Sequence, residues 1–167
     1  EIKRADRNLA TILFTDIEDS TKQMTEMGDI QWSEKMNKHD EIMKSTIESL
    51  NGKLIKNTGD GVLAVFDGPE RSIESAISSI ARLSEIDLKI RCSLHIGEVI
   101  WRNDDITGIA VNIAARALDK CPANGVIITK NLKDLLGLSK FSVISMGDFS
   151  LKGLEGNWEL FKVENSQ

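Results

Sequence analysis

The sequence has few of the residues that build disulfide frameworks and histidine metal sites. Its two cysteines, Cys92 and Cys121, do not form a Cys-x-x-Cys pair, and its two histidines, His39 and His95, are scattered. Two separated cysteines exclude a disulfide-stapled fold, and we expect a reducing, cytoplasmic compartment. Two isolated histidines leave oxygen atoms as the ligands of any bound metal ion.

The sequence also lacks long charged blocks and long apolar runs. Its net charge is −5 with no basic block, so we expect no nucleic-acid partner. No apolar run reaches the about 18 residues that a membrane span needs, and no signal peptide is visible, so we expect no direct membrane insertion. A composition of 41% hydrophobic and 28% charged residues is typical of a globular domain. Because the chain begins abruptly before a predicted strand, we expect residues 1–167 to be one domain of a longer multidomain protein.

Hydrophobic periodicity predicts an α+β protein. The predicted elements follow the order β-α-α-β-β-α-β-β-α-β-α-β-β, which suggests helices packed against a sheet. Apolar residues at helical spacing predict a long helix over 28–50 and another over 70–85. Residues 88–96 alternate apolar and polar, which predicts a half-buried strand, and Gly97-Glu98 predicts a turn into a hairpin partner at 99–101.

A short hairpin is predicted to carry two charged residues at its tip. The connector from Lys56 to Gly61 joins two apolar segments and contains Gly59, Asp60 and Gly61. Glycines in such a connector let the backbone come close to a ligand. Taken alone, the two charges fit an ordinary solvated turn equally well.

A second carboxylate ends another apolar strand. The predicted strand Leu9–Phe14 is followed by Asp16 and then by a helix start at Glu18–Thr21. If this strand neighbours the hairpin, Asp16 and Asp60 lie close together, and divalent cations relieve the repulsion of their carboxylates. Two such cations would activate an attacking oxygen and neutralise a leaving one, while helix N–H groups meet phosphate. The residues alone therefore predict a nucleotide or phosphoryl-transfer site.

Four motifs in this order resemble the catalytic domain of class III nucleotidyl cyclases, in the bacterial adenylyl cyclase branch. The motifs are Leu13-Phe14-Thr15-Asp16-Ile17 with Ser20-Thr21, Lys56 with Thr58-Gly59-Asp60-Gly61, Leu94-His95 with Gly97-Glu98-Val99, and Gly108 to Arg116. The resemblance runs from about Ala10 to Val163. It implies an α+β, ferredoxin-like βαββαβ-derived sandwich with an antiparallel-rich central sheet and flanking helices. It also implies an adenylate cyclase, a phosphorus–oxygen lyase that converts ATP to cyclic AMP and pyrophosphate.

The resemblance implies metal and base contacts for five positions. Asp16 and Asp60 match the aspartates that bind two divalent cations, Mg²⁺ or Mn²⁺, and the carbonyl of Ile17 matches a further ligand. Lys56 and Asp105 match the pair that reads the purine, in a combination similar to that of adenylyl cyclases. Adenine offers an acceptor at N1 to the ammonium and a donor at its 6-amino group to the carboxylate. Guanine reverses both polarities, so mispairing is costly.

Five further positions match residues that contact the ribose and the phosphates. Asn112 would orient the ribose, and Arg116 would stabilise charge on the α-phosphate in the transition state. Their spacing puts both on one helical face, which a solvated surface explains as well. Lys152, Ser20 and Thr21 would bind phosphate groups, although Ser20 and Thr21 are equally candidates for a helix N-cap.

The family's active site is shared between two chains, so the resemblance implies a head-to-tail homodimer with composite sites. An upstream regulatory domain of the parent protein could then control activity through the dimer. Two other functions stay open: a guanylyl cyclase, and a catalytically silent nucleotide-binding module. Two positions also stay open. Asp19 stands where many relatives carry Gly, and either caps the helix or weakens ATP binding; Asp104 takes the place of Asp105 if the alignment shifts by one residue.

Overall fold

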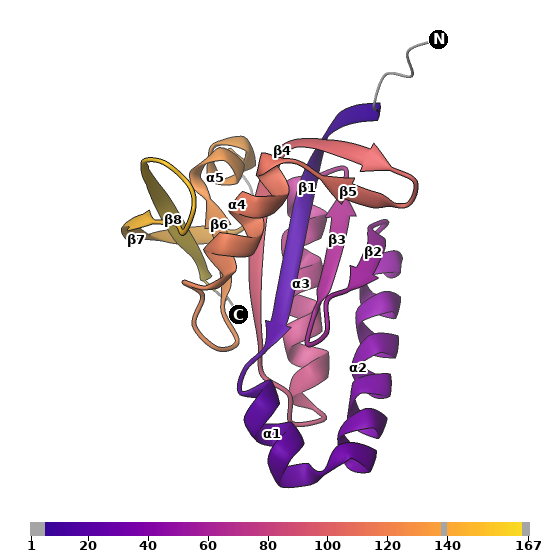
Figure 1. Cartoon of the computed structure of the whole chain (residues 1–167). Helices are drawn as coiled ribbons and strands as arrows, with labels where there is room; N and C mark the ends of the chain where they lie inside the picture. The colour runs from indigo at the N-terminus through magenta and orange to yellow at the C-terminus, as the bar shows by residue number, and fades with distance from the viewer. Residues whose placement is uncertain (1–5, 138–139, 165–167) are drawn as a thin grey trace.

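A computed structural model describes residues 6–137 and 140–164, which build an eight-stranded sheet with helices on both faces (Figure 1). The strands are β1 (Asp6–Ile17), β2 (Lys53–Asn57), β3 (Val62–Phe66), β4 (Ile90–Arg102), β5 (Asp105–Thr107), β6 (Val126–Thr129), β7 (Ser142–Ser150) and β8 (Asn157–Glu164). The helices are α1 (Ser20–Met27), α2 (Asp29–Ser49), α3 (Pro69–Ser84), α4 (Ile109–Leu118) and α5 (Lys130–Leu136). The order of helices and strands is the predicted one, except that residues 99–101 belong to β4 and the strand after it is β5.

The sheet contains a ferredoxin-like unit at its β2 edge. The strands of the whole sheet follow the order β2-β3-β1-β4-β6-β8-β7, with β5 attached to β4. The first four strands of this order make up the unit. In it, β1 is antiparallel to both β3 and β4, and α3 connects β3 to β4. Only the β4–β6 pair is parallel among the described strands. The predicted antiparallel-rich α+β fold is therefore confirmed.

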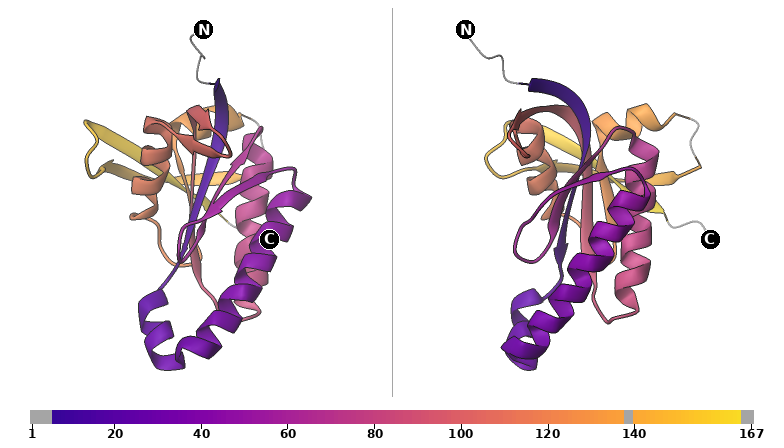
Figure 2. Two further views of the ribbon diagram at one scale, coloured as in Figure 1. Left: turned by 45° about the vertical axis from the view of Figure 1, so that its right-hand side comes forward. Right: turned by 90° about the vertical axis from the view of Figure 1, so that its right-hand side faces the viewer.

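Two apolar layers cover the central strands. The helices α2 and α3 pack on one face of the sheet and α4 on the other (Figure 2, left). Consecutive residues of β1 pack in opposite layers: Leu13 packs in the layer of α2 and α3, and Ile12 packs in the layer of α4. Burial on both faces is why β1 reads as a continuous apolar run. None of the helices in residues 6–137 and 140–164 is long and apolar enough to cross a bilayer.

The prediction for residues 88–101 was wrong in two respects. Strand β4 runs from Ile90 to Arg102 without a turn at Gly97-Glu98, and it is not half-buried, since Ser93 and His95 lie buried under α4. A Cβ on Gly97 would lie 2.7 Å from the Cβ of Ala110. The glycine is therefore needed where α4 packs closely on the strand, and not for a turn.

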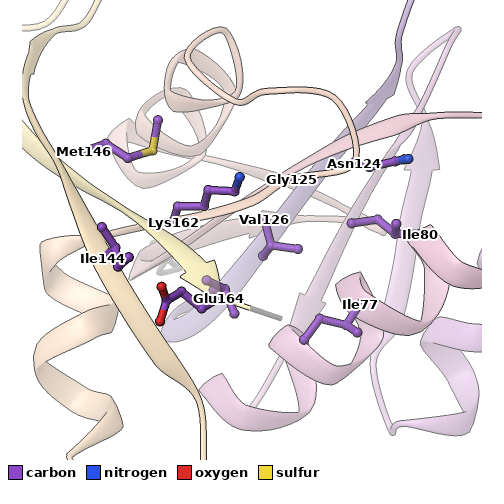
Figure 3. Close-up of a pocket in the computed structure, with 10 residues that line it drawn as sticks. Ile77, Ile80, Asn124, Gly125, Val126, Ile144, Met146, Lys162 and Glu164 are labelled. Atoms are coloured by element: carbon purple, nitrogen blue, oxygen red, sulfur yellow. The ribbon is translucent and has the colours of Figure 1, made fainter. Parts of the chain in front are cut away.

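A cavity of about 510 Å³ lies between α3 and the β7–β8 pair (Figure 3). Its walls are mainly apolar, with Ile77 and Ile80 from α3 facing Ile144 and Met146 from β7. None of the residues predicted for the nucleotide site lines this cavity.

Candidate active site

The tip of the β2–β3 hairpin rests on the end of β1. A Cβ on Gly61 would lie 1.7 Å from the carbonyl oxygen of Thr15, and the N–H of Val62 donates to the Thr15 hydroxyl at 3.1 Å. This contact places Asp60 beside Asp16, and both line an open cleft of about 760 Å³. The expected adjacency of the first strand and the hairpin is confirmed, and it brings Asp16 and Asp60 to one cleft.

Helix α1 begins at the edge of the same cleft. The hydroxyl of Ser20 donates to Oδ2 of Asp60 at 3.3 Å, and Thr21 also lines the cleft. The first N–H groups of a helix have no partner within it, so the start of α1 presents donors here. Asp19 holds the N-cap position in the left-handed region, with φ 55°, and makes no side-chain capping bond. Only glycine and short polar residues adopt this conformation readily.

Arg91 is a cleft residue that the sequence did not reveal. It lies opposite Asp16 in the β1–β4 pairing, and its Nε donates to Asp16 Oδ1 at 2.8 Å while Nη2 bonds Oδ2. The Arg91 side chain is 27% exposed and that of Asp16 18%. The hydrogen bond to Asp16 raises the pKa of Arg91. The pair is a bidentate, charge-assisted contact at the centre of the candidate site.

Cys121 also lines the cleft, on the loop that follows α4. Burial raises the pKa of its thiol to about 11. The thiol is therefore neutral at physiological pH and unsuited to act as a nucleophile.

The donor atoms around Asp16 suit a hard divalent cation. Within the described ranges, no three His, Cys, Asp or Glu side chains cluster as a metal site. Asp16, Asp60 and Ile17 line the cleft, and the acidic residues Glu18 and Asp19 line it as well. An all-oxygen donor set of this size fits Mg²⁺ or Mn²⁺ with water and phosphate completing the shell. A cation at Asp16 would compete with Arg91 for the same carboxylate oxygens.

Lys56 and Asp105 meet away from this cleft. Lys56 Nζ lies 3.0 Å from Asp105 Oδ2, and Asp105 Oδ1 accepts from the N–H of Ile106 at 2.8 Å. The bond from Lys56, and after it the bond from Ile106, lowers the pKa of Asp105. Asp104 lies exposed in the turn before β5. The alternative with Asp104 in this place therefore lacks the contact to Lys56 that Asp105 makes.

The remaining predicted residues project into solvent. Asn112 and Arg116 lie one turn apart on the exposed side of α4, and Lys152 is exposed in the turn between β7 and β8. Within the described part of the chain, these three side chains have no hydrogen-bond or ion-pair partner.

Within a single chain, the predicted residues thus lie in two separate groups. One group lines the cleft: Asp16, Ile17, Ser20, Thr21 and Asp60. None of the other five, Lys56, Asp105, Asn112, Arg116 and Lys152, lines it. Asp105 and Asp16 lie at opposite ends of β1, because β5 attaches to β4 opposite the start of β1, whereas Asp16 lies near its end (Figure 1).

Comparison with known proteins identifies the family. The sequence model of the adenylate and guanylate cyclase catalytic domain matches residues 2–165. The chain belongs to this family. An uncharacterised protein of Mycobacterium tuberculosis is 26% identical to this cyclase domain over 157 residues, which cover 92% of the domain and 40% of that relative. The domain therefore spans less than half the length of the relative.

Solved structures share the fold of this cyclase domain at low identity. The adenylyl cyclase CyaB of P. aeruginosa superimposes with a TM-score of 0.89 at 19% identity, covering 99% of this chain and 98% of that one. The guanylate cyclase domain of RhGC from Catenaria anguillulae, in complex with GTP, gives 0.84 at 19% identity, with 96% and 98% covered. The fold alone therefore does not choose between ATP and GTP.

Proposed function

We propose that this cyclase domain is an adenylyl cyclase, which converts ATP to 3′,5′-cyclic AMP and pyrophosphate. The observation that carries this proposal is the contact of 3.0 Å between Lys56 and Asp105. It puts an ammonium donor next to a carboxylate acceptor, as the N1 acceptor and 6-amino donor of adenine require. Guanine would face each group with the wrong polarity. When adenine binds, each group exchanges its bond to the other for a bond to the base.

The cleft supplies the phosphate end of the proposed site. Asp16 and Asp60, with the carbonyl of Ile17, would hold the divalent cations, Mg²⁺ or Mn²⁺. A cation bound there would lower the pKa of the ribose 3′-hydroxyl and neutralise charge on the triphosphate. Arg91 must release Asp16 as the cation binds, and its guanidinium then offers charge to phosphate oxygens. Ser20 and Thr21, at the start of α1, add hydroxyl and N–H donors.

The reaction is a displacement at phosphorus without a covalent enzyme intermediate. The 3′-oxygen of ATP forms a bond to its own α-phosphorus, the bond to the bridging oxygen of pyrophosphate breaks, and the hydroxyl proton leaves to water or substrate phosphate. Asn112 orients the ribose, so that the 3′-oxygen faces the phosphorus. Arg116 stabilises the charge that develops on the α-phosphate, and Lys152 binds the terminal phosphates.

The division of these residues into two groups supports a head-to-tail homodimer. In this proposal one protomer contributes the cleft with Asp16 and Asp60, and its partner contributes Lys56, Asp105 and the exposed residues of α4. A two-fold dimer then carries two composite sites. We also propose that residues 1–167 are the catalytic domain of a longer protein whose upstream domain controls the dimer.

The test of the function is product formation from ATP and from GTP, with Mg²⁺ and with Mn²⁺, across protein concentration. We expect cyclic AMP, with a rate per chain that rises with concentration. Cyclic GMP as the main product would overturn the choice of ATP. No product with either cation, at concentrations where the chain is dimeric, would identify a silent nucleotide-binding module instead.

A pair of neighbouring variants tests the base-reading residue. Asp105→Asn should lower kcat/KM for ATP by about 10- to 100-fold, because the hydrogen bond to the 6-amino group loses its charged acceptor. Asp104→Asn removes the same charge one residue away and should leave kcat/KM within about 2-fold. The reverse ranking would assign the role to Asp104.

A further inference from the structure

The end of β4 and strand β5 form a hairpin that reaches over β1 and β3 toward β2 (Figure 1). This hairpin carries Asp105, and β2 carries Lys56. The two strands do not pair in the sheet, where β2 is an edge strand and β5 is bonded to β4. The distance between Lys56 and Asp105 therefore depends on side-chain contacts between the hairpin and β2.

Trp101, in the hairpin, makes such contacts to two other strands. Its Nε1 donates to Oδ1 of Asn8, in β1, at 2.5 Å. The ammonium of Lys53, in β2, lies 5.0 Å from the centroid of its ring. The backbone of Trp101 pairs with Ile106, the residue after Asp105. One side chain thus ties β1 and β2 to the strand that carries the base-reading carboxylate.

An irregularity in β2 lets both of its lysines face this hairpin. Residues three apart on a regular strand point to opposite faces. The β2–β3 pairing shifts between Leu54 and Lys56, so that Lys53 pairs with Val65 and Lys56 with Leu63. Leu63 and Val65 both pack in the apolar layer on the α4 side. The bulge therefore puts Lys53 under Trp101 and Lys56 beside Asp105 on the same face.

The Lys56–Asp105 contact is too weak to fix the hairpin by itself. Both side chains are about half exposed, at 50% and 46%. Exposed ion pairs contribute only about 0–1 kcal/mol. In the proposed function, moreover, adenine takes over both charged groups, and their contact no longer joins the strands. The contacts of Trp101 use neither group, so they persist when the base is bound.

We propose that Trp101 is a positioning residue that sets the spacing of Lys56 and Asp105 and thereby the choice of adenine. This inference rests on the proposed function, whose base-reading pair it extends by a third residue. Trp101 itself touches no substrate. Its effect reaches the base through Lys53 on β2 and through Ile106 next to Asp105.

The test compares Trp101→Ala with Trp32→Phe, a change at a partly buried tryptophan of α2. The readouts are KM and kcat for ATP and GTP, and the affinities of Mn²⁺·ATP and Mn²⁺·GTP by calorimetry without turnover. We expect Trp101→Ala to raise KM for ATP about 10-fold, with kcat within about 3-fold, and to reduce the ATP-to-GTP preference about 10-fold. Trp32→Phe should leave the preference unchanged. A purely structural role would lower activity with both nucleotides equally, and that result would overturn the proposal.

A milder pair of variants covers the case in which Trp101→Ala does not fold. Lys53→Ala removes only the cation over the ring, and Lys44→Ala removes a nearby exposed cation from α2. Lys53→Ala should lower the ATP-to-GTP preference about 2- to 5-fold, since a cation–π contact at such a site is worth about 0.5–1 kcal/mol. Equal effects of the two lysine variants would overturn the proposal, because they would reflect net charge alone.

The two hypotheses fail differently. A wild-type chain without turnover overturns the proposed function, while the ratio of ATP to GTP affinity in the variants still decides the role of Trp101. A wild-type chain that binds both nucleotides equally overturns both.

Discussion

His95 is buried beneath α4, where its Nδ1 lies 2.6 Å from the hydroxyl of Thr129 and its ring meets Trp158 edge-on. Burial lowers its pKa to about 4. The imidazole is therefore neutral in the folded protein at physiological pH. It does not line the cleft of Asp16 and Asp60, so its place in the protein is structural.

This histidine should make stability depend on pH. Between pH 6.5 and about 4, the unfolded chain binds a proton at His95 that the folded chain does not. The free energy of unfolding should therefore fall as the pH falls through this window, by about 2 kcal/mol between pH 7.5 and 5.0. Urea unfolding of the wild type and of His95→Gln at both pH values measures the difference. An identical pH dependence in the two proteins would contradict a neutral buried imidazole.

At the residue scale, two groupings from the sequence recur in the structure: Lys56 contacts Asp105, and Asp16 and Asp60 line the same cleft. Arg91 was missed because its importance comes from the strand pairing. Arg91 is a charged residue in the alternating stretch 88–96, and the sequence around it does not indicate that Asp16 lies opposite it. The charge of Arg91 in a strand next to the Asp16 strand is the only signal that could have found it.

At the scale of elements, the contact between the β2–β3 hairpin and β1 determines the cleft. Gly61 is buried where the hairpin crosses the end of β1. The closeness of the two backbones, and not a strained turn, is what requires a glycine there. This contact fixes the relative position of Asp60 and Asp16.

Gly61→Ala should separate these two carboxylates. The added Cβ would lie 1.7 Å from the Thr15 carbonyl oxygen, so the hairpin must move. We expect the free energy of unfolding to fall by about 3 kcal/mol, and the affinity for Mn²⁺ to fall with it. Gly68→Ala is the control, since the nearest atom to its Cβ would be in the flexible Arg71 side chain at 3.6 Å. Urea unfolding and Mn²⁺ titration give the comparison; equal stability of the two variants would refute the close approach.

The order of the elements could be predicted because each has its own periodicity, but the course of β4 could not. Gly97-Glu98 has the composition of a turn, and the packing of Ala110 on Gly97 is a contact between distant segments. Likewise, Ser93 and His95 look solvent-facing by alternation, yet α4 covers them. Tertiary packing overrides the local pattern at each of these positions.

At the scale of the whole molecule, the fold keeps the two halves of the candidate site apart. Asp16 and Asp60 lie in the cleft at the end of β1, and Asp105, which contacts Lys56, lies on the hairpin that attaches opposite its start. Asn112 and Arg116 face solvent from α4. On the proposed function, activity therefore requires two chains, and each site is completed by residues of the partner.

The most direct test of this central claim mixes two inactive variants, Asp60→Ala and Arg116→Ala. Each variant alone should have activity below about 1% of the wild type, since every site in its dimer lacks one required side chain. In an equal mixture that exchanges subunits, half of the dimers have one intact site, so activity should recover to about a quarter of the wild-type value. Tagged chains confirm the exchange. No recovery in a mixture that demonstrably exchanges would contradict the shared site and leave each chain to supply its own.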